Sequence, residues 1–116
     1  MQYMFLIYED EAAYADADEA FLSAVVGKHM ALSQEMREAG VLLGGDGLQP
    51  TPTATTVVTG PGGAQTLHDG PFAETREHLG GYYLVEAADL DAALAWARRV
   101  PVVEGGKVEV RPVMQY

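Results

Sequence analysis

The sequence predicts one α+β domain in which two helices and a β-sheet share a single core. Short segments rich in aromatic and β-branched residues alternate with two longer segments of helical period. The 116 residues are within the usual size of one domain and too few for two cores. Apolar residues make up 48% and charged residues 21%, as in ordinary globular proteins. We therefore expect residues 1–116 to form a single domain.

The first predicted element is a strand at residues 2–8, which ends at an acidic cluster, residues 9–11. Alternate side chains of a strand point to opposite faces. One face would carry Tyr3, Phe5 and Ile7, and the other Met4, Leu6 and Tyr8. A strand that is apolar on both faces needs cover on both sides.

A helix is predicted over residues 18–39, where apolar residues recur in steps of three and four. This stripe consists of Leu22, Val25, His29, Leu32, Met36 and Ala39. Gly40 provides a C-terminal stop, and Arg37 in the last turn suits the helix dipole. His29 therefore faces the core rather than water.

The middle of the chain is predicted to hold a short strand and a hairpin. Residues 41–43 form the strand and run into residues 44–47, a glycine-rich stretch that we interpret as a turn or bulge. Residues 53–59 and 64–69 flank the glycine-rich residues 60–63 and are rich in Thr and Val, which predicts a hairpin. A polar loop over residues 69–81 follows.

The last third repeats the strand–helix–strand pattern. Residues 81–86 form a strand that is again apolar on both faces, and Asp89 is the expected N-cap of a helix that reaches about Val100, before Pro101. Residues 107–113 form the last strand.

This order of elements predicts a split βαβ, ferredoxin-like arrangement with an added hairpin and with both helices on one face of the sheet. The other face would expose Met4, Leu6 and Tyr8. Stable monomers rarely expose large apolar patches, so we expect two copies to pack sheet to sheet as a homodimer.

Charge and composition narrow the classes of partner. The chain has 17 acidic and 7 basic side chains, for a net charge of −10, which disfavours nucleic acid and anionic membranes. It has no cysteine, and therefore no thiol nucleophile or zinc thiolate site. Residues 1–8 lack the basic start of a secretory signal, and no segment is apolar enough to span a bilayer. We expect a cytoplasmic protein.

His29 and Asp69 are the main candidates for chemistry. An imidazole on an apolar stripe is either a core histidine bonded to a carbonyl group or a general acid or base. Asp69 follows a predicted strand and would orient that imidazole, but Asp-Gly-Pro is also a turn signal in its own right. Local spacing leaves both alternatives open.

The segment Asp69-Gly70-Pro71-Phe72-Ala73-Glu74-Thr75-Arg76-Glu77, followed by Leu79-Gly80-Gly81-Tyr82-Tyr83, closely resembles the DGPFAETKE group of YCII-related proteins. The resemblance continues in residues 3–8, 39–42, 48–50 and 108–112, and so covers essentially the whole chain. It implies a ferredoxin-like fold and a dimeric α/β barrel. It also implies a catalytic dyad, formed here by His29 and Asp69, and one branch of the family resembles a dehydrochlorinase. Members of the group are often linked to extracytoplasmic-function sigma factors.

The other candidates would position a substrate. Arg111 could clamp an anion or form an ion pair with Glu109 on the same strand face. Tyr8, Tyr82 and Tyr83 could line a pocket for a flat ligand, although buried tyrosines are more often structural. His68 and His78 have no metal-ligand spacing, and neither glycine-rich stretch fits a phosphate loop. We therefore expect no metal and no cofactor.

Two hypotheses of different classes follow. The first is a cofactor-independent lyase or dehydrochlorinase-like enzyme that acts on a small molecule with His29 and Asp69. The second is a non-catalytic ligand-binding or regulatory module associated with a sigma factor, because an acidic surface attracts a basic protein.

Overall fold

The computed structural model describes all residues, 1–116. The regular elements follow one another as β1 (Gln2–Asp10), α1 (Ala12–Ala15), α2 (Glu19–Glu38), β2 (Leu42–Gly47), β3 (Thr55–Thr59), β4 (Gln65–Asp69), β5 (Glu77–Glu86), α3 (Leu90–Ala97) and β6 (Lys107–Pro112). Short 3₁₀ turns precede β3 and β4, at Thr51–Thr53 and Pro61–Gly63. None of the helices has the length and apolarity that crossing a membrane requires.

Four strands form the main sheet in the order β2-β5-β1-β6, and every neighbouring pair is antiparallel. Strands β5 and β1 are therefore central, and β2 and β6 are the edges. This order and the two main helices confirm the predicted α+β, ferredoxin-like fold.

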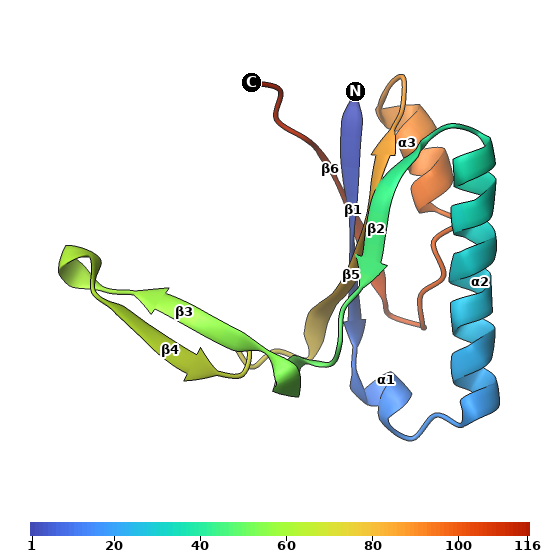
Figure 1. Cartoon of the computed structure of the whole chain (residues 1–116). Coiled ribbons are helices and arrows are strands. Elements are labelled where there is room, and N and C mark those ends of the chain that lie inside the picture. Colours follow the sequence, from blue (N-terminus) through green and yellow to red (C-terminus); the bar gives the residue numbers. More distant parts are fainter.

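Helices α2 and α3 cover the same face of the sheet (Figure 1). The core between the two layers contains Tyr3, Phe5, Ile7, Leu32, Met36, Tyr83, Val85, Ala87, Ala93, Ala97 and Val100. The predicted N-cap at Asp89 is confirmed, because its carboxylate accepts from the Ala92 N–H. Asp18, where the first helix was predicted to begin, likewise caps α2 by accepting from the Phe21 N–H. In the helical stripe, Leu32 and Met36 are buried, whereas Leu22 and Ala39 at its ends remain exposed.

The structure differs from the prediction at three places. Helix α1 was not predicted; the Asp10 carboxylate accepts a hydrogen bond from the N–H of its first residue, Ala12, at 2.9 Å. Strand β5 begins at Glu77 instead of residue 81, because residues 77–79 pair with the end of β1 beyond a bulge. Residues 44–47 belong to β2, although a register shift between Leu42 and Gly44 leaves a bulge there.

The close approach of β2 to β5 explains why β2 contains glycine at position 45. A Cβ atom on Gly45 would lie 2.7 Å from the Tyr82 carbonyl oxygen and 2.8 Å from Cδ1 of Tyr83. Only a residue without a side chain fits this close approach of β2 to β5. The glycines of β2 leave the end of the sheet under α2 without side chains.

The face of the sheet away from the helices, which we call the bare face, has no cover within the chain (Figure 1). In β1, Tyr3, Phe5 and Ile7 are buried on the helix side, and the residues that alternate with them are only half-buried. This is the predicted division of β1. The half-buried apolar residues of the two central strands on the bare face are Met4, Leu6, Tyr8, Tyr82 and Leu84.

The hairpin of β3 and β4 forms a separate two-stranded sheet, which projects from the end of the main sheet on the bare-face side (Figure 1). We call residues 55–69 the arm. Its strands pair from Thr55 opposite Asp69 to Thr59 opposite Gln65. At its tip, Gly62 and Gly63 have positive φ angles of 70° and 82°, which favour glycine. No residue of the arm is buried.

Candidate functional site

A cavity of about 510 Å³ lies between α2 and the end of the sheet that carries the glycines. One wall is the sheet-facing side of α2, which contributes Val26, His29, Ser33 and Arg37. The opposite wall consists of residues 45–47 of β2 and 80–83 of β5. Its size and its mixed apolar and polar lining suit a small organic molecule.

His29 and Tyr83 meet in this cavity. The Nδ1 atom of His29 lies 2.7 Å from the Tyr83 hydroxyl oxygen, which is a hydrogen-bond distance. The two rings are tilted by only 23° and their centroids are 6.0 Å apart. Helix α2 delivers the imidazole because His29 is on its apolar stripe, and β5 delivers the phenol from its helix-facing side. The two residues are 54 positions apart in the sequence.

The surroundings keep His29 neutral. Burial lowers the pKa of His29 below its usual 6.5, and the negative charge of Glu9 and the Pro101 carbonyl only partly offset this. At pH 7 the imidazole therefore has a free nitrogen lone pair. Burial also raises the pKa of Tyr83 above 10, with a partial offset from the Ser33 hydroxyl, so the phenol keeps its proton.

Glu9 is the carboxylate that acts on His29. Its Oε2 accepts from the Tyr14 hydroxyl at 2.6 Å and from the Val103 N–H at 2.8 Å. These two donors hold the carboxylate at the inner end of the cavity, and burial together with Glu9 raises the pKa of Tyr14 well above 10. Sequence reasoning missed Glu9, although it continues the alternation of Tyr3, Phe5 and Ile7 in β1.

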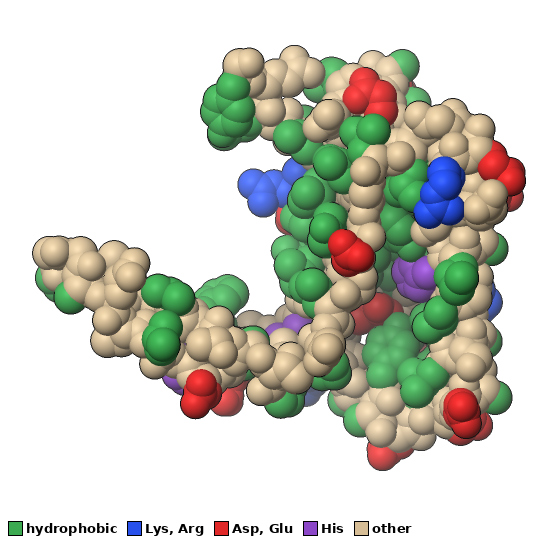
Figure 2. Space-filling model, viewed as in Figure 1, with side chains coloured by type: hydrophobic (Ala, Val, Ile, Leu, Met, Phe, Trp, Pro, Cys, Tyr) green, Lys and Arg blue, Asp and Glu red, His purple; other side chains and the backbone are tan.

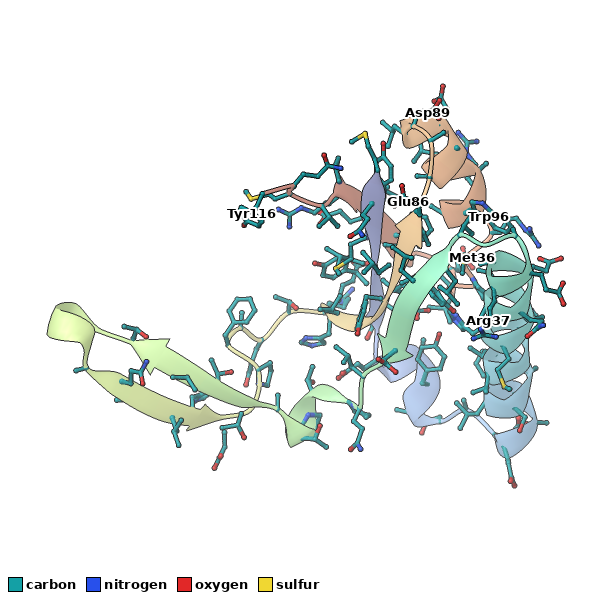
Figure 3. All side chains as sticks on the ribbon, turned by 45° about the horizontal axis from the view of Figure 1, so that its top comes forward. Met36, Arg37, Glu86, Asp89, Trp96 and Tyr116 are labelled. Carbon is teal, nitrogen blue, oxygen red and sulfur yellow. The ribbon has the colours of Figure 1, made fainter.

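The mouth of the cavity carries a guanidinium group. Arg37 lines the cavity, forms no salt bridge, and donates from Nη1 to Gln34 Oε1 at 3.1 Å. Figure 3 shows Arg37 beside Met36 near the end of α2, on the side toward the strands. The Tyr82 hydroxyl lies 3.3 Å from Oδ2 of Asp46, its partner in the pairing of β2 with β5. An anionic group entering here would meet an unpaired cation.

The structure brings only part of the predicted set together. His29 and Tyr82 line the cavity, whereas Asp69, Arg111 and Tyr8 do not. Asp69 ends β4 and is exposed at the base of the arm, so a single chain does not place it beside His29. Arg111 is opposite Met4 in the sheet and 3.9 Å from Glu109, as an exposed ion pair. The His29–Asp69 dyad stays a prediction.

The segment after Asp69 shows a turn. Gly70 has a φ angle of 111°, and its N–H donates to the Ala54 carbonyl oxygen at 2.7 Å, which closes the base of the arm. The Asp69 carboxylate accepts no hydrogen bond. No group of three or more His, Asp or Glu side chains is placed to hold a metal ion.

Fold and cavity together define a small ferredoxin-like protein with a His–Tyr pair in a pocket between sheet and helix. The sequence matches the model of the YCII-related domain over residues 1–116, and the chain belongs to this family. It is 36% identical over 118 residues to the uncharacterized protein R00369 of Rhizobium meliloti (strain 1021). That alignment covers 100% of this chain and 94% of the relative.

Proposed function

We propose that this YCII-related protein is a cofactor-independent acid–base catalyst of the lyase type, acting on a small organic anion. The observation that carries the proposal is the 2.7 Å contact between a neutral imidazole and a phenol inside a cavity of about 510 Å³. A neutral histidine in such a place is suited to accept a proton.

His29 is the proposed base, and Tyr83 orients it. In the proposed arrangement, the Nδ1–H of His29 donates to the Tyr83 oxygen, which leaves the Nε2 lone pair free. Tyr83 thus takes the orienting role that the sequence suggested for Asp69, because its hydroxyl is within reach of the imidazole. The Glu9 carboxylate favours the imidazolium that forms when the base is protonated.

The proposed reaction is an elimination. His29 removes a proton from a carbon atom of the substrate, and the electron pair of that C–H bond forms a double bond. The leaving group, chloride in a dehydrochlorinase-like reaction, departs with the electrons of its own bond to carbon. The elimination changes no net oxidation state, so it needs no oxidant, reductant or metal. The imidazolium then returns its proton to water.

Arg37 indicates the class of substrate. It is the cation at the mouth of the cavity that has no carboxylate partner, in a chain with a net charge of −10. A carboxylate or phenolate on the substrate would bind there, while the reacting carbon lies deeper, near His29. The expected substrates are small chlorinated carboxylates or phenolates.

The test is chloride release from a panel of chlorinated aliphatic and aromatic carboxylates and phenols. We expect His29→Asn to lower turnover on an active substrate by about 10²- to 10⁴-fold. Tyr83→Phe should lower it less, because the base remains while its orientation is lost. His68→Asn is the matched control, since His68 is exposed in the arm and does not line the cavity.

Circular dichroism of each variant establishes that the fold is retained. Turnover by His29→Asn within twofold of the original chain would contradict the proposal. Binding of a panel member without any chloride release would instead favour the non-catalytic ligand-binding alternative.

A further inference from the structure

The chain exposes far more surface than a self-contained protein of its size. Its accessible surface is 8085 Å², whereas a folded monomer of 12.4 kDa should expose about 6,100 Å². Its radius of gyration is 16.2 Å, against about 13 Å for a compact domain of this length. The excess of nearly 2,000 Å² is more than the ~800 Å² that one partner buries in a standard interface.

The arm accounts for much of this shape. It extends away from the main sheet, and Figure 2 shows it reaching out beside a deep recess. Apolar side chains of the arm are open to solvent, with Val57 56%, Val58 47% and Leu67 75% exposed. Val57 and Leu67 are direct partners across the hairpin and share one of its faces. A lone two-stranded hairpin is marginally stable in water, so the arm needs a surface to lie on.

The distribution of charged residues indicates which surface the arm can lie on. Residues 47–68 contain no Asp, Glu, Lys or Arg, although the chain has 17 acidic and 7 basic side chains. Exposed strands are normally protected by charged side chains, and the arm has none between its ends. Two copies that each carry −10 repel each other through most of their surfaces. The uncharged arm is the region that can meet a second copy without bringing carboxylates together. On the bare face, Glu109 lies opposite Leu6 and pairs with Arg111, and Asp46 lies opposite Tyr82. A basic partner would be drawn to the acidic surface instead.

We propose that the arm of each copy lies on a second copy of this chain, so that arm and bare face form one continuous two-fold interface. Arm and bare face border the same recess, and the apolar side chains of the bare face line its inner wall (Figure 2). The two arms would clasp the dimer from opposite sides, because a two-fold interface uses the same patch on both copies. The arm is therefore required for dimerisation, beyond the contact of the two sheets.

The test compares two double variants by sedimentation equilibrium. Val57→Lys with Leu67→Glu places an ion pair across the arm, keeps the net charge at −10, and prevents apolar burial. Val26→Lys with Met30→Glu is the matched control on α2, across the sheet from the bare face and the arm; these two side chains border the candidate cavity and are 55% and 67% exposed. We expect the original chain and the control to sediment at twice 12.4 kDa at micromolar concentration. The arm variant should dissociate at least 100-fold more readily, with an unchanged far-UV circular dichroism spectrum.

Amide hydrogen exchange provides a second measurement that needs no substitution. The amides of Val57, Val58 and Leu67 should be protected at high concentration and lose that protection on dilution below the dissociation constant. The proposal is overturned if the original chain is a monomer at about 100 µM, because a dimer with a micromolar dissociation constant would be almost fully formed at that concentration. It is equally overturned if the arm variant dimerises as tightly as the control, since the sheets alone would then suffice.

Discussion

The pair β1–β5 and the pair β3–β4 are both antiparallel ladders, yet they differ in everything that stabilises a ladder. In the first, alternate side chains of both strands are buried under helices, and Phe5 and Val85 have no exposed surface. In the second, five residue pairs form the same kind of hydrogen bonds with no buried side chain. Because hydrogen bonds in water contribute little net free energy, burial on one face decides which ladder is independently stable.

The largest expected difference in stability is between alanine substitutions of two phenylalanines. Phe5 is fully buried in β1, and Phe72, just beyond the arm, is 88% exposed. Phe5→Ala should lower the free energy of unfolding by about 3–5 kcal/mol through lost burial and a cavity. Phe72→Ala should change it by less than about 0.5 kcal/mol. Urea denaturation at one protein concentration measures both. A loss for Phe72→Ala near that of Phe5→Ala would mean that assembly buries Phe72.

A smaller effect is expected for two glycines with ordinary φ angles. A Cβ atom on Gly45 would lie 2.7 Å from the Tyr82 carbonyl oxygen, whereas one on Gly60, at the arm's tip, would meet only the Ala64 carbonyl oxygen at 3.6 Å. Gly45→Ala should cost about 1–3 kcal/mol, because β2 must move away from β5. Gly60→Ala should be neutral within about 0.5 kcal/mol. Equal unfolding midpoints for the two variants would show that the β2–β5 contact relaxes freely.

How much the sequence predicts also differs between local and distant features. The cap at Asp89, the strand at residues 2–8 and the hairpin turn depend on neighbours in the chain, and the structure has them where the sequence predicted them, although β1 continues to Asp10. Helix α1 is too short for a periodic signal, and the place of Gly45 in β2 depends on the approach of β5, which no local pattern encodes.

The candidate site shows the same limit. The stripe of α2 predicted that His29 faces inward, and this is confirmed by its place in the cavity. Its partner Tyr83 is 54 residues away, and Glu9 reaches Val103 across 94 residues. Spacing along the chain therefore pointed to Asp69, a residue that the single chain keeps at the base of the arm. The sheet register places β1 beside β5, and the packing of α2 on the sheet completes the cavity.

A third comparison concerns two aspartates, Asp89 in the main domain and Asp69 at the base of the arm, and the stability that each carboxylate contributes. Asp89 caps α3 by accepting from the Ala92 N–H at 2.9 Å, whereas the Asp69 carboxylate accepts no hydrogen bond. Asp89→Ala should cost about 1 kcal/mol, and Asp69→Ala less than half of that. Thermal unfolding of both variants measures the difference. A larger cost for Asp69→Ala would show that its carboxylate is engaged in the assembled protein.

The smallest expected effect is a change in how steeply the free energy of unfolding depends on pH. Because the pKa of His29 is lowered in the folded chain, the unfolded chain binds a proton first as the pH falls through 6.5. This histidine therefore removes stability progressively from about pH 7 down to its lowered pKa. His29→Asn deletes that contribution, so the variant should lose less stability than the original chain between pH 7.5 and 5.

His68→Asn, on the arm, controls for the loss of a histidine. Urea midpoints at the two pH values give both differences, and equal losses in the original chain and His29→Asn would contradict a neutral, desolvated imidazole in the cavity.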